Sequence, residues 1–225
     1  MCGRYTLHQK ANDLAKRFNV ARIEVKIPNS YNIAPTQYMP VITLDEYGNR
    51  QVELMKWGIQ KTIQNRKRDI FNTRDDKAFT WFWKDAVTHR RCLVPADGYF
   101  EWTKVPKGSD EPKRKYFFHP SGESLFAFAG IWESWKDVEG LEWKSYSIIT
   151  TEPNKEAARI HDRMPVILHQ EDEASWLEPS QTDRGALEAL LRPYEDNGLE
   201  VFEVDSDVNA YRFNNEKLIY PLNSQ

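Results

Sequence analysis

Strand-forming segments joined by short turns dominate this chain and constrain its fold more than any other feature. Residues 40–59 contain "PVITL" and "QVELMKWGI" on either side of "DEYGN", whose Gly and Asn suit a tight turn, so they predict a β-hairpin. Residues 90–104 predict two strands broken at Pro95–Gly98, and residues 115–135 predict a second hairpin that turns at "PSGE". Two further segments are strand-like, residues 143–153 and 199–206. Because most strands follow one another through hairpins, the pattern predicts an α+β fold with a strongly curved, mainly antiparallel sheet.

Helical periodicity is limited to short segments. In residues 8–20, "HQKANDLAKRFNV", apolar side chains recur at helical spacing and predict an amphipathic helix. Three more segments predict short helices or helical turns, residues 154–163, 170–178 and 183–194. No Pro/Gly/Ser-rich linker or internal repeat divides the chain, so we expect a single domain over residues 1–225.

Composition describes an ordinary water-soluble chain. Its 225 residues are 40% hydrophobic and 29% charged, and no apolar run approaches the roughly 20 residues that span a bilayer. The first ten residues are too polar for a secretory signal. The two cysteines, Cys2 and Cys92, form no C-x-x-C pair, and the five histidines show no metal-ligand spacing. We therefore expect a cytoplasmic protein with no membrane partner, no metal and no cofactor.

Charge is distributed unevenly along the chain. The formal net charge is −3, which by itself argues mildly against a nucleic-acid partner. Between Glu171 and Asp207, however, twelve acidic residues face two basic ones, so the rest of the chain is net basic. Basic residues gather in the first 26 residues and in "KTIQNRKRD", residues 61–69. This asymmetry allows a positive face for an anionic partner, although two solvated faces explain it equally well.

Cys2 directly follows the initiator methionine, an unusual place for one of two cysteines. Removal of Met1, which a small following side chain favours, would leave an α-amine and a thiol on adjacent carbons. The free amine has a reference pKa of about 7.7–8.0, so much of it is neutral at cellular pH and can attack an aldehyde. The thiol can then close on the imine carbon to form a five-membered thiazolidine. The alternative is that Cys2 is a small buried residue beneath the first strand.

Glu101 lies between two large aromatic rings in "GYFEWTK". Strand alternation puts Glu101 on the face opposite to Phe100 and Trp102. Aromatic surface close to a carboxylate removes solvent from it and raises its pKa toward values that are useful for proton transfer. The alternative is an outward-facing acid on a half-exposed strand.

Two other segments carry candidate site residues. In "RIHDRMPVIL", His161 has an acidic neighbour and can titrate near neutrality, and Arg163 can bind a phosphate. In "FNTRDD", Asn72 and Arg74 share a face if the segment is extended, so that the amide orients an amine and the guanidinium meets an anion. Each segment has an ordinary alternative, a histidine at a helix C-terminus in the first and a turn built from Asn and Asp in the second.

Seven segments of the chain, taken in order, resemble one protein family. They are "MCGRYT", "YNIAPTQ", "MKWGI", "NTRDD", "RRCLVPADGYFEW", "LFAFAGIWE" and "IHDRMPVIL". Together they resemble the SRAP family (SOS response-associated peptidase) from residue 2 to about residue 170, with weaker similarity to the end. The resemblance implies a single domain with a barrel-like, strongly curved β-core and flanking helices. It also implies covalent capture of abasic sites in single-stranded DNA.

The resemblance assigns roles to residues by their position in these motifs. Cys2 is expected to form the crosslink through its thiol and its freed α-amine, and Asn72 to orient that amine. Glu101 is expected to move protons as the Schiff base forms and reverses, and His161 to help open the sugar ring. The other residues expected at the DNA are Arg4, Asn32, Pro35, Arg74 and Arg163. The peptidase label of the family is tied to removal of residues that precede the cysteine.

Two segments depart from the family pattern. Members commonly have W-G-[LY]-x-P-x-W, an aromatic stretch that meets DNA, where this chain has "WGIQKTIQNRKRD". We expect Arg66, Lys67 and Arg68 to replace part of the lost base stacking by contacts with the DNA backbone. In the second segment, N-A-R-x-E is replaced by "NTRDD", residues 72–76, which shortens the acid.

Three functions remain as alternatives. The first is an abasic-site sensor of the DNA damage response, a monomer that meets single-stranded DNA at the nucleoid and shields the lesion with a thiazolidine crosslink. The second is an N-terminal-Cys peptidase or amidohydrolase in which the Cys2 thiolate attacks a carbonyl and His161 is the base. The third is a reader of modified single-stranded DNA that never bonds to it covalently.

Overall fold

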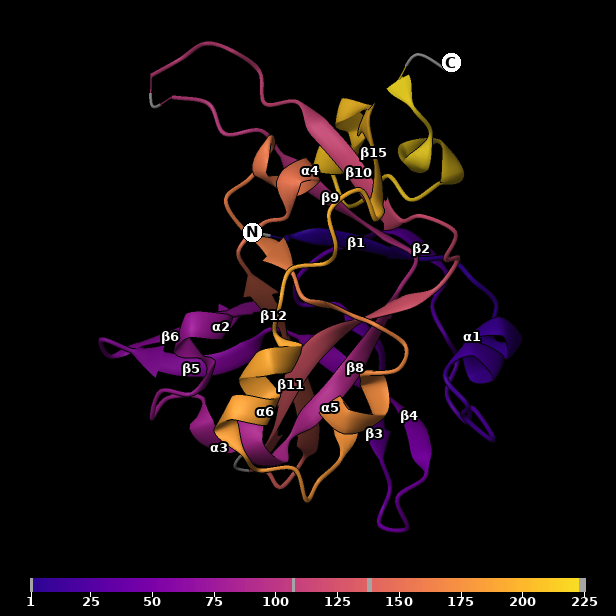
Figure 1. Ribbon diagram of the computed structural model, residues 1–225, viewed down its shortest axis with the longest axis vertical. Coiled ribbons are helices and arrows are strands. Elements are labelled where there is room, and N and C mark those ends of the chain that lie inside the picture. The colour runs from indigo at the N-terminus through magenta and orange to yellow at the C-terminus, as the bar shows by residue number, and fades with distance from the viewer. Residues whose placement is uncertain (1, 107, 137–138, 223–225) are drawn as a thin grey trace.

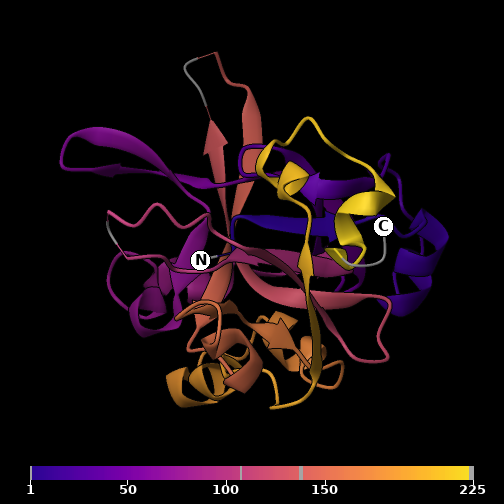
Figure 2. The same ribbon diagram turned by 90° about the horizontal axis from the view of Figure 1, so that it is seen from above.

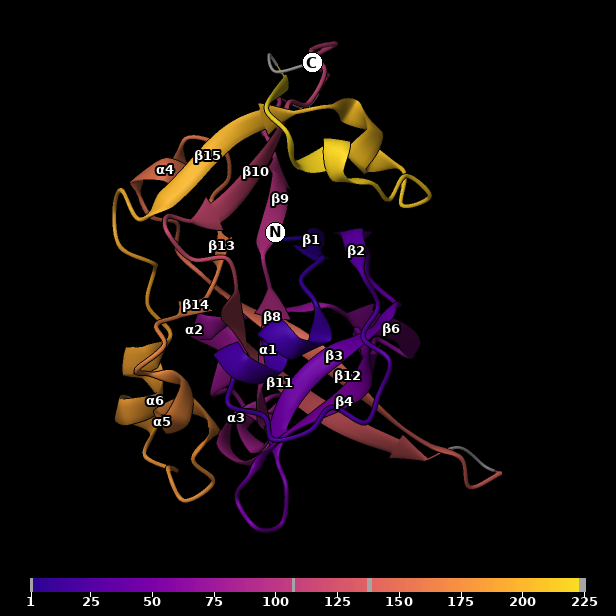
Figure 3. The ribbon, with the colours of Figure 1, turned by 90° about the vertical axis from the view of Figure 1, so that its right-hand side faces the viewer.

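Two β-sheets form the framework of the computed structural model, which describes residues 2–106, 108–136 and 139–222. The strands of the first sheet, in spatial order, are β15 (Leu199–Val204), β10 (Lys115–Pro120), β9 (Gly98–Trp102), β1 (Arg4–Leu7) and β2 (Ser30–Ile33). This sheet lies above the second one in Figures 1 and 3. Since β1 is flanked by β9 and β2, the N-terminal strand is held from both sides.

The second sheet closes on itself to form a barrel. Its strands, in spatial order, are β13 (Met164–Pro165), β12 (Glu142–Thr151), β4 (Arg50–Trp57), β3 (Tyr38–Leu44), β8 (Arg91–Ala96), β11 (Phe126–Lys136) and β14 (Ile167–Leu168), with β7 (Asn72–Arg74) beside β12. β11 and β12 also pair with each other, which closes the ring β12–β4–β3–β8–β11. Within the ring, β12 runs parallel to β4 and the other neighbours are antiparallel. The predicted α+β fold with a strongly curved, mainly antiparallel sheet is therefore confirmed.

A two-stranded hairpin projects from the body of the molecule, as Figure 2 shows. It consists of β5 (Ile59–Ile63) and β6 (Arg66–Ile70). Gln64 and Asn65 form its turn with positive φ angles of 50° and 60°, the backbone conformation that two-residue hairpin turns of type I′ require. The hairpin joins the body through ion pairs of Lys56 with Asp69 and of Lys61 with Glu133.

The helices are short and lie around the outside of the sheets (Figure 1). They are α1 (Ala11–Arg17), α2 (Asp75–Ala78), α3 (Lys84–His89), α4 (Lys155–Ala158), α5 (Glu173–Leu177), α6 (Arg184–Leu190) and the 3₁₀ turns η1 (Ser206–Asn209) and η2 (Glu216–Ile219). The helix predicted over residues 8–20 is shorter than expected, because Asn19 takes a positive φ of 51° and ends it. Among the described residues, no helix is long and apolar enough to cross a membrane.

Aromatic side chains connect the two sheets. The ring of Tyr5 in β1 meets Trp57 edge to face at a centroid distance of 5.1 Å and Phe128 at 6.0 Å. Its hydroxyl pairs with the hydroxyl of Tyr146 at 2.7 Å, which satisfies two buried polar groups at once. Because these partners belong to the barrel, β1 is fixed against it, and so is the cysteine that precedes β1.

Local patterns predicted some strand pairings correctly and one wrongly. The hairpin at residues 40–59 is confirmed, with Tyr38 opposite Lys56 and Leu44 opposite Arg50. Residues 90–104 form β8 and β9, which separate at Asp97, as predicted. The hairpin predicted over residues 115–135 is wrong, because β10 pairs with β9 and β15 whereas β11 pairs with β8, β12 and β14. The turn between them carries the chain from one sheet to the other.

Gly98 begins β9 where that strand passes beneath an aromatic ring. A Cβ added there would lie 2.0 Å from Cζ of Phe117, and Phe117 is itself packed in an apolar cluster with Phe100 and Val204. We expect Gly98→Ala to lower the free energy of unfolding by about 1–3 kcal/mol, measured by urea denaturation. Gly185→Ala is the control, since its Cβ has no neighbour nearer than 3.4 Å and α6 gains helix propensity. Equal losses in both variants would contradict the prediction.

Candidate functional site

Cys2 lies immediately before β1, and its side chain is fully buried. The thiol makes a weak hydrogen bond to the backbone oxygen of Arg4 at 3.5 Å. Burial, with a further contribution from the charge of Glu101, raises the pKa of the Cys2 thiol well above its usual range. The thiol is therefore protonated at neutral pH. Met1 lies outside the described residues, so its removal stays a prediction.

Asn72 contacts Cys2 directly. It begins β7, which runs parallel to β12 with Asn72 opposite Ile148, and this pairing aims the amide at the start of β1. Its Nδ2 donates to the backbone oxygen of Cys2 at 2.7 Å. Its Oδ1 is buried and accepts no hydrogen bond from the residues that the structure describes. The amide thus offers a buried acceptor beside the cysteine.

Glu101 lies on β9, next to β1, and is 3% exposed. Burial raises the pKa of this carboxyl to about 7, and the nearby charge of Asp162 adds to the effect. The Glu101 charge in turn raises the pKa of the Cys2 thiol, so the two groups are electrostatically coupled. A carboxyl that titrates near neutrality both donates and accepts protons readily at cellular pH.

His161 follows α4 and lies beside Asp162, which is itself paired with Lys104. Its Nδ1 accepts a hydrogen bond from the backbone N–H of Arg163 at 3.1 Å and is 3.0 Å from Oδ1 of Asp162. The other carboxylate oxygen of Asp162 is 2.5 Å from Nζ of Lys104. Burial is the main cause that lowers the pKa of His161. The lowered pKa keeps the ring mainly neutral near pH 7.

Two of the three arginines expected to meet phosphates, Arg74 and Arg163, are each held by an acid of α2. Nη2 of Arg163 donates to Oδ1 of Asp75 at 2.6 Å and also to the backbone oxygen of Thr150. Arg74 makes a two-pronged pair with the exposed carboxylate of Asp76, at 2.8 and 2.9 Å. The shortened acid of "NTRDD" is thus part of a charge network that orients both guanidinium groups at the end of β7.

The remaining predicted DNA-contact residues lie outside this charge network. Arg4 and Asn32 bind backbone oxygens of the C-terminal segment, Arg4 at Asn209 and the buried Asn32 at Val208, Ala210 and Phe213. Pro35 lies in the turn between β2 and β3 and is half-buried. The three residues of the β5–β6 hairpin that were predicted to contact the DNA backbone are all exposed on β6. They are Arg66, Lys67 and Arg68.

The structure therefore brings together Cys2, which precedes β1, Asn72 of β7 and Glu101 of β9. The charge of Asp162 acts on both Glu101 and His161. Sequence reasoning missed the partners that orient these groups. Asp75 could have been suspected because it follows Arg74 directly, whereas Lys104 gave no signal, since its partner is distant in sequence.

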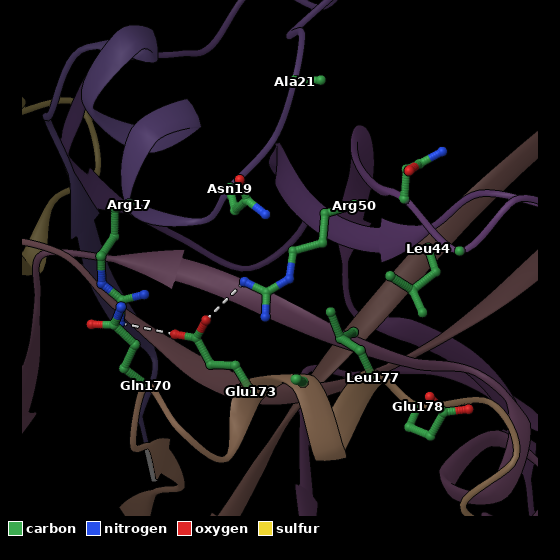
Figure 4. Close-up of a pocket in the computed structure, with 12 residues that line it drawn as sticks. Arg17, Asn19, Ala21, Leu44, Arg50, Gln170, Glu173, Leu177 and Glu178 are labelled. Atoms are coloured by element: carbon green, nitrogen blue, oxygen red, sulfur yellow. Dashed lines mark hydrogen bonds and ion pairs between the residues drawn. The ribbon is translucent and has the colours of Figure 1, made fainter.

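One sizeable cavity lies away from this site. It has a volume of about 620 Å³ and lies between the end of α1, the β3–β4 turn and α5. Figure 4 shows the buried carboxylate of Glu173 between Arg17 at 2.9 Å and Arg50 at 3.0 Å. Both oxygens of this carboxylate are used in holding α1 and β4 against α5, which is a structural role. Within the described residues, no group of three or more His, Cys, Asp or Glu side chains could hold a metal ion.

Comparison with known proteins shows which proteins this chain resembles. A protein named abasic site processing protein YoqW, from Bacillus subtilis, is 36% identical over 97% of this chain and 99% of its own. Abasic site processing protein YMR114C of Saccharomyces cerevisiae is 27% identical over 99% of this chain and 68% of its own. A crystal structure of a protein from Bacteroides thetaiotaomicron has a TM-score of 0.85 and 25% identity, covering 98% of this chain and 99% of that one. Residues 1–211 match the family described as SOS response associated peptidase (SRAP), and the chain belongs to this family.

Proposed function

We propose that this protein captures abasic sites in single-stranded DNA by forming a thiazolidine through Cys2 after removal of Met1. The observation that carries the proposal is the amide of Asn72, which donates to the Cys2 carbonyl at 2.7 Å and keeps a buried, unused acceptor beside it. Such an acceptor would bind an N–H of the freed α-amine and direct its lone pair toward the aldehyde. The names of the Bacillus and yeast relatives support the same class of substrate.

The reaction begins with opening of the abasic sugar. Opening moves the C1′ hydroxyl proton to the ring oxygen, a transfer that the neutral imidazole of His161 would assist. The neutral amine then adds to the aldehyde carbon, and protonated Glu101 gives the proton with which the hydroxyl leaves as water. The Cys2 sulfur adds to the resulting iminium carbon, and the thiol proton returns to Glu101. Amine, aldehyde and thiol thus yield a thiazolidine and one water, with Glu101 restored.

The thiazolidine accounts for protection of the lesion. An open abasic sugar carries an aldehyde, which activates the neighbouring position for β-elimination and strand cleavage. Because the thiazolidine consumes the aldehyde, it removes the group that drives this elimination. Arg74 and Arg163 would hold the flanking phosphates through charge-assisted hydrogen bonds, exchanging one of their carboxylate partners for DNA.

A denaturing gel tests the proposal. The protein, shown by intact mass to lack Met1, is mixed with a single-stranded oligonucleotide that contains one abasic site, and we expect a shifted band. The matched control is an oligonucleotide with a tetrahydrofuran analogue, which lacks the aldehyde and should give no band. Absence of the band with the true lesion would refute the proposal. Peptide cleavage without a DNA adduct would instead favour the peptidase, and salt-sensitive DNA binding without an adduct would favour the non-covalent reader.

The peptidase is the weaker candidate on physical grounds. Thiol nucleophiles of peptidases act as thiolates, and their pKa is lowered by a neighbouring cation or helix terminus. Burial and the charge of Glu101 act in the opposite direction on Cys2 and raise the pKa of its thiol. A thiol that adds as the last step to an already formed iminium ion does not need a resting thiolate.

A further inference from the structure

A second cavity borders the proposed site. It has a volume of about 590 Å³ and lies between the segment that follows β9 and the segment that follows α4, with His161 in its wall. Cavities of this size hold ligands as large as a nucleotide. The cavity adjoins the proposed site through His161, and its wall also contains Lys104, three residues after Glu101 in the chain.

Basic side chains outnumber acidic ones in the wall of this cavity. Lys104 and Arg114 come from the segment between β9 and β10, and Arg159 follows α4, whereas the acids are Glu111 and Asp162. Arg159 is exposed, and its guanidinium group makes no hydrogen bond or ion pair within the part of the chain that the structure describes. Arg114 is 3.9 Å from Glu203 and largely exposed. These guanidinium groups are therefore available to an anion from outside the protein.

Apolar groups form another part of the wall. Pro112 comes from the β9–β10 segment, and Pro153 and Ile160 come from the two ends of the α4 segment. Flat or aliphatic surfaces of this kind suit the sugar or the face of a base, as the basic groups suit a phosphate. Cations together with apolar surface match the chemistry of a nucleotide better than that of a simple inorganic anion.

An ion-pair chain connects the cavity to His161. Nζ of Lys104 binds one oxygen of Asp162 at 2.5 Å, and the other oxygen is 3.0 Å from Nδ1 of His161. A phosphate that bound Lys104 would replace Asp162 at the ammonium group. The carboxylate of Asp162 would then interact with His161 alone. Ligand binding in the cavity would therefore change the electrostatic environment of His161, the residue proposed to assist opening of the abasic sugar.

We propose that this cavity binds the nucleotide that adjoins the abasic one in the DNA strand, with its phosphate at Lys104 and Arg159 and its sugar or base against Pro112 and Ile160. The proposal rests on the proposed function for the identity of the strand. It adds a subsite, specific to one side of the lesion, that would place the abasic sugar between His161 and Cys2.

Arg159→Ala tests the subsite, and Arg22→Ala is the matched control. Arg22 is also an exposed arginine, is paired with Glu24 and follows α1 in the chain. Helices α1 and α4 lie on different sides of the molecule (Figure 1). Crosslinking rates are measured at subsaturating protein with three oligonucleotides, in which the abasic site is internal, at the 5′ end or at the 3′ end. Binding of undamaged single-stranded DNA is measured in parallel by fluorescence anisotropy at several salt concentrations.

We expect Arg159→Ala to slow crosslinking to the internal lesion about 3–10-fold and to lower the salt slope of binding by about 0.7, while Arg22→Ala matches the unsubstituted protein. The slowing should persist with one end-lesion oligonucleotide and vanish with the other, which lacks the nucleotide that fills the cavity. Equal slowing with all three oligonucleotides, or none with any, would overturn the subsite. If the unsubstituted protein formed no crosslink, the proposed function would fail, and the anisotropy comparison of the two variants would still support or overturn the subsite.

Discussion

Cys2→Ala is expected to abolish the crosslink that survives denaturation. After removal of Met1 the variant keeps its α-amine but has no sulfur to close the ring. The amine would still form a Schiff base, which hydrolyses on denaturation, so no shifted band should remain. Treatment with borohydride before denaturation reduces the imine to a stable amine and should restore the band. The expected loss is therefore the complete loss of the unreduced adduct, measured on the same denaturing gel.

Cys92→Ala is the matched control for this prediction. Cys92 is the second buried cysteine, and its thiol lies in the core, against Gly130 on β11. Because it is remote from the reaction in the proposed mechanism, this variant should form the adduct to the same extent as the unsubstituted protein. A stable adduct in Cys2→Ala without reductant would contradict the thiazolidine, and loss of the reducible adduct as well would mean that the amine is not the attacking group.

Glu101→Gln is expected to slow crosslinking about 100-fold or more, since general acid–base catalysis typically contributes that much. The pH dependence gives the sharper measurement. The rate should rise with pH as the α-amine, with a reference pKa of about 7.7–8.0, becomes neutral. It should fall above pH 7 as Glu101, with a pKa of about 7, loses the proton needed to expel water. In Glu101→Gln the falling limb should disappear and the rising limb should remain; an unchanged bell-shaped profile would contradict the assignment.

The same substitution should change stability in the opposite direction to activity. The pKa of Glu101 is raised from 4.5 to about 7 in the folded protein, mainly by burial. Between these values the folded protein binds a proton that the unfolded chain has lost, so stability falls as pH rises, by up to about 1.4 kcal/mol per pH unit. Glu101→Gln has no charge to bury. Its melting temperature should therefore exceed that of the unsubstituted protein at pH 8 and approach it at pH 4.5.

Local sequence patterns predicted strands well and their distant partners poorly. The β3–β4 hairpin followed from alternation on both sides of "DEYGN", because a short turn leaves no other partner so near. The turn between β10 and β11 has the same local character, yet β10 completes its sheet with β15, far along the chain. The β5–β6 hairpin was not predicted, because charged side chains occupy most of its exposed strand β6 and hide the alternation.

The candidate site residues could be named from the sequence, but the contacts that orient them could not. The neighbours of Glu101 in sequence are aromatic, so its desolvation followed from the pattern around it. The contact of Asn72 with Cys2 depends on parallel pairing of β7 with β12, which no local pattern reveals. The link from Lys104 through Asp162 to His161 joins two loops and likewise needs the folded chain. Motif order supplied the assignment of roles in place of this geometry.

The place of β1 between β9 and β2 has a mechanical consequence. A DNA strand joined to Cys2 would pass any tension straight into the end of β1. Bonds in an antiparallel sheet are perpendicular to the strands, so a pull along β1 loads its bonds to both neighbours in shear and at the same time. The Tyr5 contacts with the barrel add to this resistance. An enzyme that pulled the DNA past the lesion would therefore have to break the hydrogen bonds of β1 to both neighbouring strands. It would need to unfold this sheet before it could remove the protein fold from the DNA.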